Sequence, residues 1–322
     1  MIYSRIIGTG SELPEKVMTN TDLEKLVDTT DEWIQARTGI KERRVAADGQ
    51  TTADLAEAAA IKAMAAAEVT PRDIDAIIVG TTTPDLVFPS TACLVQARLG
   101  CLGVCAMDVN AACSGFIYAL GVADKFIRCG DAHRVLVIGS ETLTRMINWD
   151  DRGTCVLFGD GAGAVVLEAS EAPGILSTHL HANGDFADLL KADGGVSRGF
   201  EGHENGGVHV MMKGNEVFKV AVRTLGQIVD ETLAANSMDK SDVDWLIPHQ
   251  ANMRIITATA KKLNMPMDHV IVTVDRHGNT SAGSVPLALD EAVRSGKIQR
   301  GEVLLLEAFG GGFTWGSALL RY

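Results

Sequence analysis

Cys113 lies at a turn between a segment that resembles a strand end, residues 108–110, and a segment that resembles a helix, from Gly115 onward. Its neighbours in DVNAACSGF are small, which leaves room for a substrate to approach. A helix N-terminus can lower the pKa of a thiol from about 8.5 to roughly 3.5–7.5. The position therefore predicts a thiolate nucleophile, although a buried cysteine is also a common packing residue.

Two further polar residues follow predicted strands. His249, in IPHQAN, comes after the strand WLI, and Asn279, in HGNTSAG, comes after the strand TVD. Alone, the histidine could be a core residue and the asparagine a turn residue. Because chemistry collects beyond the carboxyl ends of strands in open α/β sheets, we expect both to face Cys113. A thiol with two hydrogen-bond donors that polarise a carbonyl group is suited to acyl transfer.

Three consecutive glycines follow a predicted strand in FGGGFTWG, residues 309–316. Glycine permits close backbone approach, so an N–H group here could pair with that of Cys113 to hold a developing oxyanion. A tight connection between strands would use the same residues. No GxGxxG opens a helix after a strand, so a dinucleotide-binding fingerprint is rejected.

An internal repeat supplies the elements that must position these side chains. A helical segment leads into DIDAIIVG at Asp73, and another leads into DVDWLIPH at Asp242, 169 positions later. A helix, a strand–turn–helix unit and further strands follow in the same order in both halves, with one insertion at residues 143–158. The halves are predicted to be residues 1–172, carrying the nucleophile, and 173–322, carrying His249 and Asn279.

The apolar runs are short and β-branched and alternate with helical periods. This pattern is typical of βαβ units with mostly parallel, doubly covered sheets. Two such halves packed together predict an α/β fold, a duplicated five-layered α/β/α/β/α sandwich.

Composition excludes several classes of function. The chain has 322 residues, of which 46% are hydrophobic, and its 41 acidic against 29 basic residues give a net charge of -12. Such a chain repels nucleic acid and anionic membrane, although a local basic patch could dock an acidic partner. It shows no signal-peptide pattern, no apolar run long enough to span a bilayer and no CxxC pair, although a zinc site through Cys101 and Cys105 stays open. We expect a cytoplasmic protein with reduced thiols, no metal and no permanently bound cofactor.

The sequence resembles the thiolase-fold condensing enzymes, and among them the β-ketoacyl-[acyl-carrier-protein] synthase III family, over its whole length. The motifs that match in order are DEWIQARTGIKERR, FPSTAC, DVNAACSGF, GDGAGAVVL, MKGNEVFKVAV, PHQAN, GNTSAGSVPLAL and EAFGGGFTWGSALLRY. The catalytic triad of the family falls on Cys113, His249 and Asn279. The resemblance implies that Cys113 takes a short acyl group, such as acetyl, from acyl-CoA. A neutral His249 and Asn279 would then hold malonyl-[acyl-carrier protein] while it loses carbon dioxide and attacks the acyl group.

The resemblance also implies substrate contacts. The N–H groups of Cys113 and Gly311 would be the oxyanion donors. Further residues would bind CoA or the acyl chain, or reach across the twofold interface of a homodimer. They are Trp33 and Arg152 at the adenine, Arg37 at the phosphates, Gly214 and Asn215 along the pantetheine, Phe309 beside the sulfur, and Phe88 in the partner's acyl pocket. Without the resemblance, the three aromatic residues would be assigned to core packing and Asn215 to a helix cap.

A carrier protein is acidic and needs a basic landing site. Arg254, Lys261 and Lys262 are spaced to share one face of a predicted helix that begins just after His249. The resemblance extends this docking stretch to Gln250. A charged helix face is otherwise simply solvated.

Other functions in the same fold stay open. A degradative thiolase uses a second cysteine near the C-terminus, but no cysteine follows Cys155 here, and chain-elongating synthases carry a histidine in place of Asn279. A condensing enzyme of secondary metabolism with another acyl donor fits the same triad. A non-catalytic scaffold of the same fold would not need to keep Cys113.

Overall fold

The computed structural model describes residues 2–199 and 208–322. Its two main sheets have the strand orders β1-β7-β6-β4-β5 and β11-β12-β13-β8. The strands of the first sheet are β1 (Tyr3–Glu12), β4 (Ala76–Gly80), β5 (Cys105–Val109), β6 (Arg134–Thr142) and β7 (Asp160–Ser170). Those of the second sheet are β8 (Ile175–Ala182), β11 (Trp245–Pro248), β12 (Val303–Gly310) and β13 (Thr314–Arg321).

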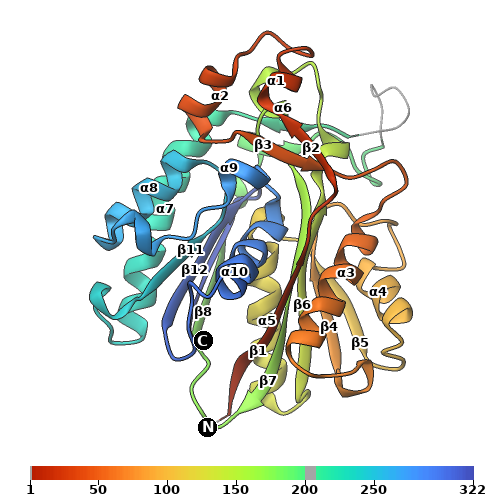
Figure 1. Cartoon of the computed structure of the whole chain (residues 1–322), viewed down its shortest axis with the longest axis vertical. Coiled ribbons are helices and arrows are strands. Elements are labelled where there is room, and N and C mark those ends of the chain that lie inside the picture. The colour runs from red at the N-terminus through yellow and green to blue at the C-terminus, as the bar shows by residue number, and fades with distance from the viewer. Residues whose placement is uncertain (1, 200–207) are drawn as a thin grey trace.

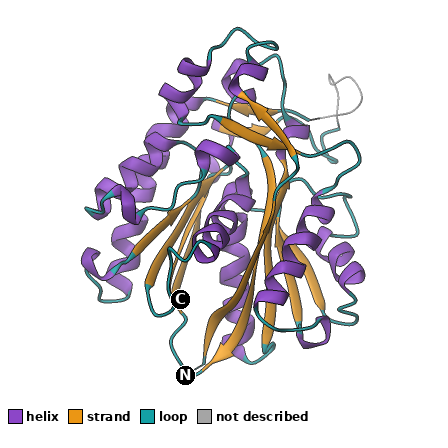
Figure 2. Ribbon diagram, in the orientation of Figure 1, coloured by secondary structure: helices purple, strands orange, loops and turns teal. Residues whose placement is uncertain are grey.

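Helices cover both sheets and fill the space between them. The long helices are α3 (Thr52–Ala66), α4 (Thr91–Leu99), α5 (Gly115–Cys129), α7 (Gly214–Ala235), α8 (Met253–Leu263) and α10 (Ser284–Arg294). Figure 1 shows α3 and α4 on the outside of one sheet, α5 and α10 between the sheets, and α7 and α8 outside the other. Figure 2 shows the same alternation of purple and orange layers. The five-layered α/β/α/β/α sandwich expected from the sequence is confirmed.

Small elements gather at one end of the molecule, at the top of Figure 1. They are β2 (Lys16–Thr19), α1 (Asn20–Leu23), α2 (Asp31–Thr38), β3 (Glu42–Val45), α6 (Arg152–Cys155) and α9 (Val274–His277). The further pair β9 (Leu190–Ala192) and β10 (Val210–Met212) forms a separate two-stranded sheet. No helix among the described residues has the length and apolar character needed to cross a membrane.

The expectation of mostly parallel sheets is wrong. The pairs β4–β5, β4–β6 and β11–β12 are parallel, but β1–β7, β6–β7, β12–β13 and β13–β8 are antiparallel. For β12 and β13, the antiparallel pairing follows from the short connection between them. Only residues 311–313 separate the two strands, and so short a connection can join only antiparallel strands.

The repeat is visible in the element order. The 3-10 turns Ala112–Ser114 and Ser281–Gly283 lead directly into α5 and α10, and their starts are 169 residues apart, the spacing expected from the sequence. The second half departs from the repeat at one strand. Where the first half has β5, the second has only the isolated pairing of Leu246 with Val270 and then α9. The expected TVD strand before Asn279 is therefore wrong.

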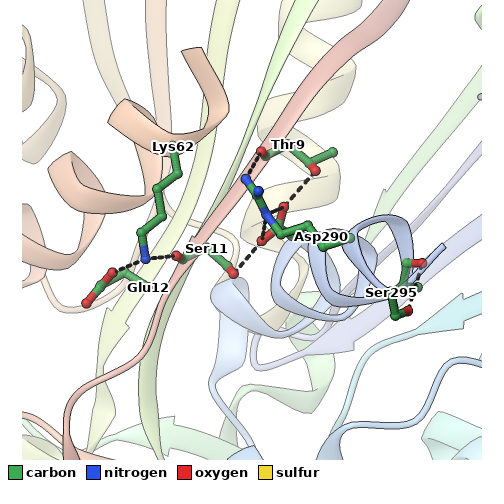
Figure 3. Close-up of polar contacts among 8 residues, drawn as sticks. Thr9, Ser11, Glu12, Lys62, Asp290 and Ser295 are labelled. Carbon is green, nitrogen blue, oxygen red and sulfur yellow. Dashed lines mark hydrogen bonds and ion pairs between the residues drawn. The ribbon is translucent and has the colours of Figure 1, made fainter. Parts of the chain in front are cut away.

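Strand β1, which the sequence analysis did not identify, ties the two halves together. Figure 3 shows Asp290 of α10 accepting hydrogen bonds from Thr9 (2.7 Å) and Ser11 (2.5 Å) on this strand. From the other side, Lys62 of α3 pairs with Glu12 at 2.5 Å. These contacts fix the central helix α10 against the first sheet.

Candidate active site

One cavity of about 390 Å³ receives residues from both halves of the chain, and Cys113, His249 and Asn279 all line it. His249 follows β11 directly, and Cys113 lies between β5 and α5. All three side chains are at least nine-tenths buried. The structure therefore brings a thiol, an imidazole and a carboxamide to one enclosed volume.

The turn that carries Cys113 is held by the C-terminal strand. Ala112 has a φ of 46°, a conformation that non-glycine residues seldom adopt. The Thr314 hydroxyl donates to the carbonyl of Ala111 at 2.7 Å, and the Ser114 hydroxyl donates to the carbonyl of Thr314 at 3.1 Å. A Cβ atom on Gly310 would lie 2.6 Å from the backbone nitrogen of Cys113, so only glycine permits this approach. The glycine run thus packs its backbone against the cysteine turn.

Burial changes the expected chemistry of Cys113. Instead of being lowered, its pKa is raised to about 12, chiefly because the thiol is withdrawn from water and also because the Glu141 carboxylate is near. The expected resting thiolate is therefore wrong. Helix α5 begins two residues later, at Gly115.

The ring of His249 is held by a serine hydroxyl. Its Nδ1 lies 2.6 Å from the hydroxyl of Ser284, and the same hydroxyl accepts a hydrogen bond from the N–H of Gln250. When Nδ1 accepts the hydroxyl proton, the ring carries its own proton on Nε2. Burial lowers the pKa of His249 to about 3, so the ring is neutral at pH 7. A neutral ring with Nε2–H can donate a hydrogen bond, as expected from the sequence.

Asn279 is fixed by its backbone and by its amide oxygen. Its N–H donates to the carbonyl of Leu157 at 2.8 Å, and its Oδ1 accepts from the N–H of Ser281 at 2.9 Å. With the oxygen engaged, the amide nitrogen is the group left to donate into the cavity.

Two residues beside the cysteine were not identified from the sequence. Ser281 lines the cavity together with Cys113, and its hydroxyl donates to Glu141 at 3.0 Å. Glu141 is fully buried at the carboxyl end of β6. The strand-end rule that selected His249 would have found Glu141 as well, but nothing in the sequence marks Ser281 apart from its neighbours.

Of the residues expected at the adenine and phosphates of CoA, Trp33 and Arg37 line the cavity, and Arg152 does not line it but contacts Trp33. The guanidinium of Arg37 lies 4.3 Å from the centre of the Trp33 ring. The guanidinium of Arg152 lies 4.8 Å from the same ring, and Arg152 also donates to the carbonyl of Asp28. The three residues thus form one stack at the surface, suited to a planar ligand.

The other expected substrate residues divide into two groups. Gly214, Asn215, Phe309 and Gly311 all line the cavity. Asn215 is not the helix cap, because α7 begins at Gly214 with Lys213 before it. Phe88 does not line this cavity and is 82% exposed on the surface.

Helix α8 presents the expected basic face. Arg254 and Lys261 are exposed, and Lys262 pairs with Asp230 of α7 at 2.5 Å. Gln250 was expected to join this surface, and that expectation is wrong. Its side chain is fully buried, and its amide bonds the backbone at Pro248, Ile271 and residues 273–274. These hydrogen bonds hold the turn that precedes helix α8.

All six cysteines are free, and no cluster of three or more His, Cys, Asp or Glu side chains suited to a metal ion occurs in the part of the chain that the structure describes.

Comparison with known proteins agrees with this geometry. The family model of 3-oxoacyl-[acyl-carrier-protein] synthase III matches residues 107–184. The family model of the C-terminal part of the same synthase matches residues 233–322. The chain is 70% identical to β-ketoacyl-[acyl-carrier-protein] synthase III of Xanthomonas euvesicatoria over 321 residues, covering 100% of this chain and 99% of the relative.

Solved structures show the same fold. The crystal structure of 3-oxoacyl-[acyl-carrier-protein] synthase III from Aquifex aeolicus has a TM-score of 0.93 and 52% identity, over 99% of this chain and 100% of that one. The priming β-ketosynthase of the R1128 polyketide pathway has a TM-score of 0.94 and 35% identity, over 99% and 96% of the two chains. The chain therefore belongs to the β-ketoacyl-[acyl-carrier-protein] synthase III family, also called 3-oxoacyl synthases, which are thiolase-fold acyltransferases.

Proposed function

We propose that this chain condenses a short acyl group from acyl-CoA with malonyl-[acyl-carrier protein]. The products are 3-oxoacyl-[acyl-carrier protein], CoA and carbon dioxide, and the reaction starts fatty-acid chains. The observation that carries the proposal is the convergence of Cys113, His249 and Asn279 on one cavity in a chain 70% identical to a curated synthase III.

In the first half-reaction Cys113 takes the acyl group. Its sulfur attacks the thioester carbonyl, and the N–H groups of Cys113 and Gly311 hold the oxyanion. Each such donor contributes about 3–4 kcal/mol to transition-state stabilisation. The close packing of Gly310 against Cys113 supports this assignment, because it brings the glycine run beside the backbone nitrogen and Cβ of Cys113.

In the second half-reaction His249 and Asn279 hold the thioester carbonyl of the malonyl group. The Nε2–H of His249 and the amide nitrogen of Asn279 donate to this oxygen and stabilise the enolate that forms as carbon dioxide leaves. The enolate carbon then attacks the acyl group on Cys113. The neutral ring of His249, whose Nδ1 contacts the Ser284 hydroxyl, supports the role of donor.

The substrates approach from the surface that carries the basic and aromatic groups. Trp33 and Arg152 sandwich the adenine of CoA, Arg37 contacts its phosphates, and Gly214 and Asn215 border its pantetheine arm. Phe309 adjoins the acyl group. Because Arg152 lies 4.8 Å from the Trp33 ring, the adenine must part the pair by about one ring thickness, roughly 3.5 Å.

The partners are an acyl-carrier protein and a second copy of the chain. Arg254, Lys261 and Lys262 form the landing site for the carrier, and Phe88 enters the acyl pocket of the second copy. The enzyme acts in the cytoplasm with acyl-CoA as substrate and without a bound cofactor.

Intact-mass spectrometry after incubation with acetyl-CoA tests the proposal. The wild-type chain should gain one acetyl group, and Cys113→Ala should gain none. The absence of an adduct with every short acyl-CoA would instead favour a non-catalytic scaffold.

A condensing enzyme of secondary metabolism is the second candidate, favoured by the likeness to the priming β-ketosynthase of a polyketide pathway. The two functions differ in acyl donor and in the acceptor used. A panel of acyl-CoA chain lengths with malonyl-[acyl-carrier protein] separates them, because rejection of that acceptor would select the second function.

A further inference from the structure

The second half of the chain lacks the strand that leads to Cys113 in the first half. There, β5 pairs with β4 over its whole length. The corresponding segment of the second half pairs with β11, among the described residues, only through the isolated pairing of Leu246 with Val270. The buried backbone groups that follow, in residues 271–274, therefore need hydrogen-bond partners from elsewhere.

Gln250 supplies these partners, because its fully buried side chain spends its whole amide group on backbone atoms. Its Nε2 donates to the carbonyls of Pro248 (2.7 Å) and Ile271 (3.0 Å). Its Oε1 accepts from the N–H groups of Thr273 (2.8 Å) and Val274 (3.1 Å). A carboxamide has two N–H donors and an oxygen with two lone pairs, so its capacity is fully used. The side chain thus takes the place of the missing strand.

The far end of the same segment contacts the same part of the chain. The hydroxyl of Ser284, at the start of α10, lies 2.6 Å from Nδ1 of His249 and accepts from the N–H of Gln250 at 3.4 Å. Asn279 lies between the two points of contact. The dipeptide His249–Gln250 therefore holds the segment 271–284 on both sides of Asn279.

The first half of the chain holds Asn279 separately. The Asn279 N–H donates to the carbonyl of Leu157 at 2.8 Å, and its carbonyl accepts from the N–H of Gly159 at 3.0 Å. These two bonds place Asn279 relative to the half that carries Cys113. The bonds of Gln250 place it relative to His249.

We propose that Gln250 is a positioning residue that sets the separation of His249 and Asn279, so that both can donate to one carbonyl oxygen. The inference rests on the proposed function, in which that oxygen belongs to the malonyl thioester. Gln250 does not line the cavity, so it acts through the two donors. A misplacement of about 1 Å at a site of this kind can slow a reaction by about 10²-fold.

A purely structural role for Gln250 predicts a different result. Loss of buried hydrogen bonds that only stabilise the fold would make the protein easier to unfold and would leave the ratio of the two half-reactions unchanged. Loss of positioning slows only the half-reaction that uses both donors. Acetylation of Cys113 depends instead on the N–H groups of Cys113 and Gly311.

Two variants remove the bonds of Gln250 in steps. Gln250→Glu keeps the shape and an acceptor for the two N–H groups, but loses at least one of the two donors. Gln250→Met keeps the length and loses all four bonds. The matched control is Thr232→Val, which removes a fully buried hydroxyl of α7 that does not line the cavity.

The first arm measures two rates in a rapid-quench device. They are the acetylation of Cys113 by acetyl-CoA, and the release of carbon dioxide when the acetylated enzyme is mixed with malonyl-[acyl-carrier protein]. Gln250→Met should be acetylated within about threefold of the wild-type rate and should release carbon dioxide about 10²-fold more slowly. Gln250→Glu should lie between Gln250→Met and wild type, and Thr232→Val should match wild type in both rates.

The second arm measures amide hydrogen exchange by mass spectrometry without substrate. In Gln250→Met, peptides that cover residues 271–276 should exchange about tenfold faster or more, because the N–H groups of Thr273 and Val274 lose their acceptor. Peptides from α7 should keep their wild-type rates. Thr232→Val should leave residues 271–276 unchanged.

The proposal is overturned if Gln250→Met releases carbon dioxide at the wild-type rate, or if its acetylation slows in the same proportion. Unchanged exchange of residues 271–276 would also overturn it. If Gln250→Met does not fold, the same criteria apply to Gln250→Glu. A wild-type chain that releases no carbon dioxide from malonyl-[acyl-carrier protein] would refute the proposed function, and the exchange arm would still decide whether Gln250 holds the segment.

Discussion

At the scale of single residues, burial controls the chemistry of this site. The same withdrawal from water that raises the pKa of Cys113 lowers that of His249, because each group is kept in its neutral form. A neutral imidazole suits a hydrogen-bond donor, whereas a neutral thiol requires a proton acceptor. Ser284, which contacts the His249 ring, and Glu141, whose charge adds to the raised pKa of Cys113, therefore belong to the environment of the site.

Another buried acid gives a pH prediction. Glu307 is fully buried on β12, and burial raises its pKa to about 8. The folded protein keeps this proton between about pH 4.5 and 8, where the unfolded chain releases it. The stability that the group contributes is complete below the unfolded pKa and is lost as pH rises towards 8.

The Glu307→Gln variant should therefore become more stable relative to wild type as pH increases. The difference in the free energy of unfolding should shift towards the variant by roughly 1.4 kcal/mol per pH unit between pH 5 and 8. Urea unfolding of both proteins at three pH values measures it. A difference that does not change with pH would refute the assignment of a proton to Glu307.

Residue identities in the sequence located Cys113, His249 and Asn279, because their types and their places after strands carry the signal. The protonation states of these residues could be predicted from the sequence only in part. The neutral His249 was expected, but the raised pKa of Cys113 was not, since it depends on burial and on the charge of Glu141, a residue that tertiary structure brings close from another segment. Local sequence shows the helix end but not the loss of hydration.

At the scale of elements, the central helices α5 and α10 determine where the site residues lie. Each presents a buried aspartate, Asp124 or Asp290, that accepts a hydroxyl from β1 and pairs with an arginine four residues later. The arginine of α5 also donates to the carbonyl of Ile175 on β8. Both sheets are thereby tied to the helices between them.

Asp290→Ala should lower the free energy of unfolding by about 2–3 kcal/mol. The loss leaves the hydroxyls of Thr9 and Ser11 without their buried acceptor, while the half-exposed Arg294 stays partly solvated. Glu291→Ala on the same helix removes the half-exposed pair with Arg276 and a 3.6 Å contact with the buried, neutral ring of His277, and should cost less than about 1 kcal/mol. Urea unfolding compares the two, and equal losses would contradict the role of Asp290.

Helix α8 gives a prediction about docking. Arg254→Glu should raise the KM for malonyl-[acyl-carrier protein] by about tenfold or more and leave that for acetyl-CoA within about twofold, since charge complementarity acts on the acidic partner. Arg72→Glu is the control. It makes the same charge change in the 3-10 turn Pro71–Asp73, which precedes β4 and is not part of helix α8. Steady-state kinetics at low and moderate salt measures both constants. A parallel rise for the two substrates would remove the docking assignment.

The sequence predicted the helices that have a strong apolar periodicity, but it did not predict the strands whose apolar pattern is weak. The helices before Asp73 and Asp242, and the helix from Met253 to Leu263, are where the apolar spacing indicated. Asn279 instead follows α9, because in TVDRHG the strand-like residues are too few to pair beyond Leu246–Val270. The antiparallel strands depend on connection length and sheet edges, which local pattern does not encode.

At the scale of the whole molecule, a doubled architecture lets residues of two similar halves meet. The first sheet uses only residues up to Ser170 and the second only residues from Ile175, so the division at 172/173 proposed from the sequence falls in the connection between β7 and β8. The chain carries a net charge of -12, and the basic face on α8 is a local exception to it. That contrast is what an acidic carrier could recognise.

The exposed apolar loop predicts self-association. Leu86, Val87 and Phe88 are 51%, 74% and 82% exposed in one stretch. Phe88→Asp should raise the dissociation constant of a homodimer by about tenfold or more, because large aromatic anchors carry much of the energy of an interface. Ile61→Asp, on α3, also alters an exposed apolar residue and should have little effect. Sedimentation velocity over a concentration series decides, and a monomeric wild-type chain would refute the prediction.

The central claim is that Cys113, His249 and Asn279 act together on one pair of substrates. Its most direct test starts from enzyme already acetylated on Cys113 and mixes it with malonyl-[acyl-carrier protein] in a rapid-quench device. Wild type should lose the acetyl group and release one equivalent of carbon dioxide, whereas His249→Ala and Asn279→Ala should keep the acetyl group and release almost none. Carbon dioxide release at the wild-type rate from both variants would contradict the account.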